Sequence, residues 1–292
     1  MSQTQSEPQH TLYFAYTHGC GGLGDMIKGM ATCLYIATNF GYNFDYRFNH
    51  EMGQIFKDKT FKPHEKYPVL RYIDHKQSRP IVDFFKNDKN RTQSYILYIN
   101  GCLDFPRNPI DPSKPFLSEV TPFLNRYYKE ILPIYNYIQA PNITQLSAPY
   151  QVLHVRMGDL YLNEATNKGD NRIKNQGNYE EKLEYCIQNL PHKPTLVCSD
   201  CQAIQQEILS KLPGSFVVQT NQYHFAYRTG RPTDQIVDSI KDTLVEHKIM
   251  THADAIYKFV YSGYPILAAT IGNVPLYEVT KNGFELYKSE WI

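Results

Sequence analysis

The second half of this sequence alternates short apolar segments with helical ones, and that order restricts the fold more than any other feature. The predicted strands are 152–155, 195–198, 216–219 and 254–257, and the predicted helices are 179–190, 202–212, 234–250 and a last one that includes 266–270. Strands that alternate with helices form parallel sheets with helical crossovers. We therefore predict a Rossmann-like α/β domain.

The first half opens with the same kind of pattern. A strand at 12–16, a glycine-dense turn at 19–24, a helix from 26 to about 38 and a strand at 44–48 are typical of a βαβ unit. From 56 to 142 the pattern is poorer, with a strand at 94–99 and a helical stretch at 117–137. The predicted organisation is a disordered tail at 1–10, an N-terminal Rossmann-like domain at 11–145 and a C-terminal one at 146–292, whose last helix packs back on the first domain.

Composition narrows the class of protein. The 292 residues exceed the usual size of one core, and 30 basic against 29 acidic residues leave a net charge of +1 without a basic block. Nucleic acid is therefore not an expected partner. The polar start and the absence of any apolar run near 18 residues predict a cytoplasmic protein without a signal peptide or membrane span. In that compartment the six cysteines are expected to be reduced.

A His, an Arg and an Asp follow one another where the strand at 152–155 ends. His154 and Arg156 share a face of the strand, and Asp159 comes three residues later. Open α/β sheets bind ligands at the carboxyl ends of their strands, and a forked guanidinium suits an anion such as phosphate. The alternative is a purely structural salt bridge of Arg156 at the strand end.

A glycine loop near the N-terminus gives a second interpretation. Gly19-x-Gly21-x-x-Gly24 lies between a strand and a helix, and Asp45 follows about 20 residues later, as in the dinucleotide-binding fingerprint. An NAD-dependent oxidoreductase is therefore an alternative function. Asp25 at the helix start argues against it, because that carboxylate caps the helix and repels a pyrophosphate.

Two shorter patterns carry less weight. Ser262-Gly263 stands between a strand and a helix, which is the arrangement of an anion site at a helix start, although Ser262 could serve as a simple N-cap. Cys198 and Cys201 match C-x-x-C, but no second cysteine pair or histidine pair accompanies them. We therefore predict no metal site and no redox pair.

Four blocks in order resemble a known family. They are Gly21-Gly22-Leu23-Gly24-Asp25, His154-Val155-Arg156-Met157-Gly158-Asp159, Val197-Cys198-Ser199-Asp200, and the segment from Glu246 through Ala253-Asp254 to Ser262. Together they resemble the GDP-fucose-dependent fucosyltransferases with the H-x-R-R-x-D motif, namely the α1,2-, α1,6- and protein O-fucosyltransferases. The chain departs from the family in having Asp25 where Asn is usual and Met157 in place of the second Arg.

The resemblance implies a fold of two Rossmann-like domains facing a cleft, the GT-B arrangement, with the nucleotide sugar on the C-terminal domain. It implies that Arg156 grips the β-phosphate, that His154 and Glu246 contact the nucleoside side, and that Ser262 donates to the pyrophosphate. The other implied donor-binding residues are Gly21, Gly22, Gly24, Asp25, Asp200 and Gly263. Asp159 and Glu164 are the two candidates for the general base.

The expected activity is transfer of a sugar to a glycan hydroxyl with inversion. The sequence contains no D-x-D motif, so neither a cofactor nor a divalent metal is expected, and Arg156 becomes the main electrostatic catalyst. GDP-fucose is the first choice of donor, and the departures at Met157 and Asp25 keep another nucleotide sugar such as UDP-xylose open. A catalytically silent sugar- or nucleotide-binding protein is a further alternative. The sequence does not indicate whether the protein is a monomer or an oligomer.

Overall fold

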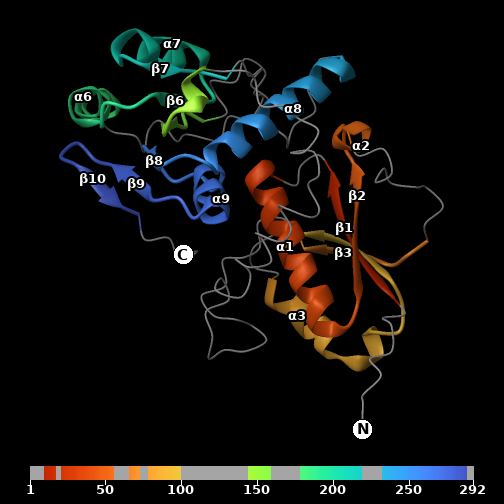
Figure 1. The fold of residues 1–292 in the computed structure, drawn as a ribbon. Helices are drawn as coiled ribbons and strands as arrows, with labels where there is room; N and C mark the ends of the chain where they lie inside the picture. The colour runs from red at the N-terminus through yellow and green to blue at the C-terminus, as the bar shows by residue number, and fades with distance from the viewer. Residues whose placement is uncertain are drawn as a thin grey trace. The chain divides into compact units, whose positions relative to one another are not determined.

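A computed structural model describes residues 10–17, 21–55, 66–72, 78–99, 144–158, 178–218 and 232–287. The chain divides into two compact units, one of Met1–Ile131 with Phe225–Arg228 and one of Leu132–His224 with Thr229–Ile292 (Figure 1). Each unit holds its own sheet. The domain boundary predicted after residue 145 stays a prediction.

The first unit is built on a four-stranded parallel sheet of order β2-β1-β4-β3. Its strands are β1 (Thr11–Thr17), β2 (Asn43–Asn49), β3 (Val69–Tyr72) and β4 (Tyr95–Ile99). Its helices are α1 (Leu23–Phe40), α2 (Met52–Ile55), α3 (Ser78–Lys86) and the 3₁₀ turn η3 (Asp88–Asn90). Alternate residues of β1, namely Leu12, Phe14 and Tyr16, are fully buried, which is the period that a strand with one apolar face requires.

Helix α1 approaches this sheet closely at one glycine. A Cβ atom at Gly29 would lie 2.4 Å from the carbonyl oxygen of Ile99 and 2.9 Å from the ring of Phe14. Only glycine therefore fits at this position without a shift of the backbone. The contact sets the distance between α1 and strands β1 and β4.

The second unit holds a six-stranded sheet of order β10-β9-β8-β5-β6-β7. Its strands are β5 (Gln151–Val155), β6 (Thr195–Ser199), β7 (Ser215–Phe216), β8 (Ala255–Lys258), β9 (Leu276–Val279) and β10 (Phe284–Leu286), all parallel except β10. Its helices are the 3₁₀ turn η4 (Thr144–Ser147), α6 (Tyr179–Asn189), α7 (Gln202–Lys211), α8 (Thr233–Met250) and α9 (Gly263–Gly272).

Helices cover both faces of this sheet. On one face Leu153 and Val155 of β5 pack in a cluster with apolar residues of α6 and α7. On the other face the ring of His154 lies 5.9 Å from that of Tyr264 in α9, and the thiol of Cys198 bonds to Glu246 in α8. Every residue of β5 is consequently buried, as expected for a central parallel strand.

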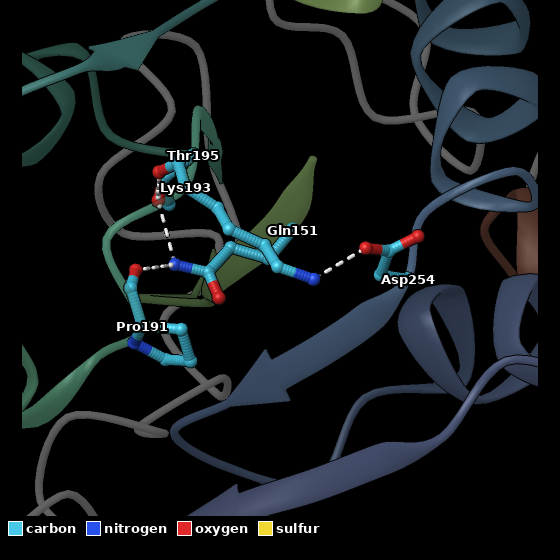
Figure 2. Close-up of polar contacts among 5 residues, drawn as sticks. All are labelled: Gln151, Pro191, Lys193, Thr195 and Asp254. Carbon is cyan, nitrogen blue, oxygen red and sulfur yellow. Dashed lines mark hydrogen bonds and ion pairs between the residues drawn. The ribbon is translucent and has the colours of Figure 1, made fainter. Parts of the chain in front are cut away.

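The amino-terminal edge of the sheet is held by structural contacts (Figure 2). The side-chain amide of Gln151 donates to the carbonyl of Pro191 at 2.9 Å and to the hydroxyl of Thr195 at 3.0 Å. Lys193 forms an ion pair with Asp254 at 2.5 Å. These contacts join the starts of β5, β6 and β8, so this edge serves stability.

Most predicted elements are confirmed within three residues at their ends. The strand predicted at 216–219 is only Ser215–Phe216. The last predicted helix, which includes 266–270, is found as α9, and its packing on the first domain stays a prediction. The strands at 276–279 and 284–286 were not predicted. The helical stretch predicted at 117–137 lies outside the described residues, and α2, β3 and α3 were not predicted.

Within the described part of the chain, no helix is long and apolar enough to cross a membrane. The cysteines described there, Cys33, Cys186, Cys198 and Cys201, are buried free thiols.

We expect Gly29→Ala to lower the free energy of unfolding of the first unit by about 1–3 kcal/mol, because the added methyl group overpacks the contact with Ile99. In an open position the same change stabilises a helix by about 1 kcal/mol. Denaturant unfolding measures the effect, with Gly283→Ala as the control because no atom lies within 4 Å of its Cβ position. Equal stability of the two variants would contradict the close contact.

Candidate functional site

The carboxyl edge of the second sheet brings together polar side chains from three strands. His154 of β5 pairs in register with Cys198 of β6 on one side and with Lys258 of β8 on the other. Parallel strands end at the same edge, so residues far apart in the sequence become neighbours there. The row of side chains faces α8 and α9.

Arg156 and Asp200 lie one step further along the same edge. An Nη1 atom of Arg156 is 3.0 Å from Oδ2 of Asp200, and their side chains are 16% and 7% exposed. The same carboxylate accepts the backbone N–H of Met157 on Oδ1 at 2.6 Å and that of Gly158 on Oδ2 at 2.8 Å. Gly158 has φ +106, a conformation that favours glycine. Asp200 therefore holds three successive residues after β5.

Burial and hydrogen-bond partners shift the pKa of the Asp200 carboxyl group in opposite directions. Burial raises the pKa of Asp200 above its ordinary value, while the guanidinium of Arg156 and the two backbone N–H groups oppose that rise. The ion pair that was the alternative interpretation of Arg156 is thus present. It does not exclude an anion site, because a guanidinium carries five N–H donors and this pair uses one nitrogen.

The side chain of Met157 points away from the candidate site. It is 6% exposed and belongs to the apolar cluster with Leu183 of α6 and Ile208 of α7. A thioether suits that environment, whereas a charged side chain there would lose its hydration. This explains physically why the residue at this position is apolar.

Glu246 is buried beneath the start of α9. Its Oε1 accepts a hydrogen bond from the hydroxyl of Tyr264 at 3.3 Å, and it also bonds to the thiol of Cys198. Burial raises the pKa of Glu246 from 4.5 to about 7, and these two hydrogen bonds oppose the rise. Neighbouring His247 bonds through Nε2 to the carbonyl of Tyr264 at 3.0 Å, and burial lowers its pKa to about 4.

Ser262 is the N-cap residue of α9, and Gly263 is the first residue of the helix. The hydroxyl of Ser262 makes no capping hydrogen bond, so the simple capping interpretation is wrong for its side chain. Ser262 is 5% exposed, and its strand-like φ of −152° aims the chain into the helix. The amino end of α9 therefore follows β8 at the same edge that carries Arg156.

The glycine loop lies in the first unit, and its geometry is that of a helix start. Gly21 has φ +83, and its carbonyl accepts the hydroxyl of Tyr16 at 2.7 Å. The backbone N–H of Gly22, the N-cap of α1, donates to Oδ2 of Asp25 at 3.2 Å, while Gly24 lies in the first turn. The capping role predicted for Asp25 is confirmed.

The acidic residue of the dinucleotide fingerprint is not where that interpretation requires it. Asp45 lies inside β2, four residues before the strand ends, and forms an ion pair with Arg47 at 2.5 Å. A ribose-binding carboxylate stands at the carboxyl end of its strand. This finding weighs against the oxidoreductase.

The remaining predicted residues divide into two groups. Cys198 bonds to Glu246 on one face of the sheet while Cys201 packs in the cluster on the other, so they do not form a pair. Within the described ranges no group of three or more His, Cys, Asp or Glu could hold a metal ion. Asp159 and Glu164 lie outside the described residues, as does Gly19.

Sequence reasoning missed two residues of this edge. Lys258 is fully buried, with Nζ 2.7 Å from Oε2 of Glu278 and 3.8 Å from the ring centre of Tyr287. Tyr264 packs between His154 and His247. A lysine at the end of an otherwise apolar strand was the available signal, since lysine is rarely buried without a partner.

Comparison with known proteins gives a fold but no family. No protein-family model matches the chain, and no curated protein matches it. Among solved structures, NodZ alpha-1,6-fucosyltransferase co-crystallized with GDP matches with a TM-score of 0.52 and 9% identity, over 95% of this chain and 98% of that one. Fucosyltransferase NodZ from Bradyrhizobium matches with a TM-score of 0.52 and 10% identity, over 92% and 94%.

The chain has the fold of the NodZ fucosyltransferases. This confirms the predicted α/β fold class and the structural side of the predicted resemblance. The likeness extends over nearly the whole of both chains, so it is not confined to one Rossmann-like unit.

We expect Glu246→Gln to change the pH dependence of stability. The folded pKa of about 7 exceeds the ordinary 4.5, so the folded state binds more protons between these values and the wild-type unfolding free energy falls as pH rises through them. Glutamine removes this loss, so the variant gains on the order of 3 kcal/mol relative to wild type between pH 4 and pH 8.

Urea unfolding at a series of pH values measures this difference. The lowered pKa of His247 makes the protein less stable as pH falls from 6.5 to about 4, which is the opposite direction. His247 is present in both proteins, so its contribution cancels in the difference between them. Glu184→Gln, at an exposed position of α6, is the matched control. A difference that stays flat with pH would show that Glu246 is not buried as described.

We expect Met157→Arg to lower the free energy of unfolding by about 3–5 kcal/mol, because it places an unpaired charge in the cluster beneath α6 and α7. Met157→Leu keeps the volume and apolar character and costs less than about 1.5 kcal/mol. Chemical denaturation distinguishes the two. A stable Met157→Arg protein with tighter GDP binding would place this side chain at the donor site instead.

Proposed function

We propose that the protein is a glycosyltransferase that moves a sugar, fucose from GDP-fucose as the first choice, to a glycan hydroxyl. The observation that carries the proposal is the position of Arg156 beside His154 at the carboxyl edge of the second sheet, where Ser262 also forms the N-cap of α9. The fold shared with the NodZ enzymes supports it. The four sequence blocks supply the assignment of roles.

Arg156 is the proposed electrostatic catalyst. Its guanidinium donates to the β-phosphate and stabilises the negative charge that grows on the leaving diphosphate. The hydroxyl of Ser262 and the backbone N–H groups at the start of α9, from Gly263 onward, add neutral donors to the same anion. These donors take the place of a divalent metal, in keeping with a sequence without a D-x-D motif.

The proposed reaction is a single displacement with inversion. An oxygen of the acceptor hydroxyl forms a bond to C1 of the sugar while the bond from C1 to the phosphate oxygen breaks, and that electron pair leaves with the diphosphate. The acceptor proton passes to a carboxylate. Asp159 and Glu164 remain the two proposed bases.

The other donor-site residues are proposed to act at different distances from the nucleotide. His154 contacts the nucleoside side directly. Glu246 is buried under Tyr264, and we propose that it acts by holding that residue and the start of α9 in place. Gly21, Gly22 and Gly24 allow close approach of the donor, whereas the carboxylate of Asp25 is engaged by the backbone of Gly22.

Ligand-dependent thermal stabilisation tests the donor class. GDP, GDP-fucose, UDP, UDP-xylose and NAD are compared in the presence of a chelator. We expect stabilisation by GDP and GDP-fucose, and transfer to a glycan acceptor is then followed by chromatography. Stabilisation by the uridine nucleotides alone would show that the donor is a UDP-sugar. Stabilisation by NAD alone would contradict the proposal. Binding without transfer or donor hydrolysis would indicate a catalytically silent binding protein.

Arg156→Ala is expected to lower the transfer rate about 100- to 1,000-fold, because one oxyanion-type donor is lost. Lys193→Ala is the matched control, since it also removes a cation from an ion pair, but at the amino edge of the same sheet. Initial rates with both variants, together with their melting temperatures, give the comparison. Near-wild-type activity of a folded Arg156→Ala protein would make the ion pair with Asp200 purely structural.

A further inference from the structure

The carboxylate of Asp200 is engaged mainly by the segment that carries Arg156, besides a hydrogen bond from the backbone of Asp200 itself. Oδ1 accepts the N–H of Met157, and Oδ2 accepts the N–H of Gly158 and faces Nη1 of Arg156. These contacts of 2.6, 2.8 and 3.0 Å come from three consecutive residues. Such a pattern restrains both the main chain and the side chain at the end of β5.

Direct contact of Asp200 with a diphosphate is electrostatically unfavourable. A carboxylate and a phosphate repel each other, and here the carboxylate is only 7% exposed and accepts a bond on each oxygen. The resemblance places Asp200 among the donor-binding residues, but the geometry points its oxygens at the protein. Its effect on the donor must therefore pass through Arg156.

We propose that Asp200 is a positioning residue, which orients the guanidinium of Arg156 toward the diphosphate and holds the turn at Met157 and Gly158. This inference rests on the proposed function. An arginine side chain loses rotamer entropy when it is immobilised. The ion pair with Asp200 restrains the side chain of Arg156 before the donor binds, so less rotamer entropy is lost during catalysis.

The geometry explains why this position is aspartate. Two adjacent N–H groups and a guanidinium converge on one group, and only a carboxylate offers acceptors on both oxygens. Asparagine would present an N–H₂ group to one of these donors. Glutamate keeps both acceptors but places them one methylene further from β6.

The test measures kcat and KM for Asp200→Asn, with Asp254→Asn as the control. Asp254 also pairs with a lysine, but at the opposite edge of the sheet and with 42% exposure. We expect kcat to fall by about 100-fold in Asp200→Asn, from misplacement of Arg156, and Asp254→Asn to stay within twofold of wild type. Asp200→Glu is expected to recover part of kcat, which a simple loss of folding stability would not predict.

A double-mutant cycle decides whether Asp200 acts through Arg156. Binding of GDP is measured by calorimetry for the wild type, Arg156→Ala, Asp200→Asn and the double variant. We expect Asp200→Asn to change GDP affinity in the wild-type background and to have no further effect once Arg156 is alanine. An equal change in both backgrounds would overturn the proposal, because Asp200 would then contact the nucleotide independently.

A readout without nucleotide separates this inference from the proposed function. The guanidinium signals of Arg156, assigned in ¹⁵N spectra by their loss in Arg156→Lys, report hindered rotation while the ion pair is intact. We expect fast rotation in Asp200→Asn and restored hindrance in Asp200→Glu. Unchanged signals in Asp200→Asn would overturn the inference even if GDP binds, whereas absence of GDP binding to the wild type would overturn the proposed function alone.

Discussion

The candidate site depends on the parallel pairing of β5 between β6 and β8. All five residues of β5 are buried, because helices cover both faces of the sheet and neighbouring strands take its backbone hydrogen bonds. The register then places His154 between Cys198 and Lys258. No local interaction in the chain could bring these three together, and a shift by one residue would turn His154 and Arg156 to the opposite face.

Burial at the carboxyl edge of the second sheet makes the interactions between charged groups stronger than they would be at an open surface. Asp200, Glu246 and Lys258 are each taken out of water, and each has a partner that offsets the loss of hydration. Their pKa values move in the direction that burial dictates, upward for the two carboxyl groups and downward for the lysine. Fixed partners in a low dielectric hold charge without reorganisation, which is the property that stabilisation of a leaving diphosphate requires.

The elements near the centre of the sheet were predictable, and those at its edges were not. The segment at 152–155 is apolar except for His154, because both faces of β5 are buried, and α8 carries a helical period over its whole length. Strands β9 and β10 are only four and three residues long, which is too short to show a readable period. Arg156 was predictable as an edge residue because it follows a strand, but its partner Asp200 follows a different strand, β6.

By itself, the sequence determined the α/β class, the parallel sheet with helical crossovers and the place of His154 and Arg156 at a strand end. Only the tertiary structure decided that Met157 faces the core under α6 and α7, that Asp45 pairs within β2, and that Ser262 leaves its helix uncapped. Hydrophobic period records how deeply a residue is buried, whereas the partner of a side chain depends on register and packing between segments distant in the chain.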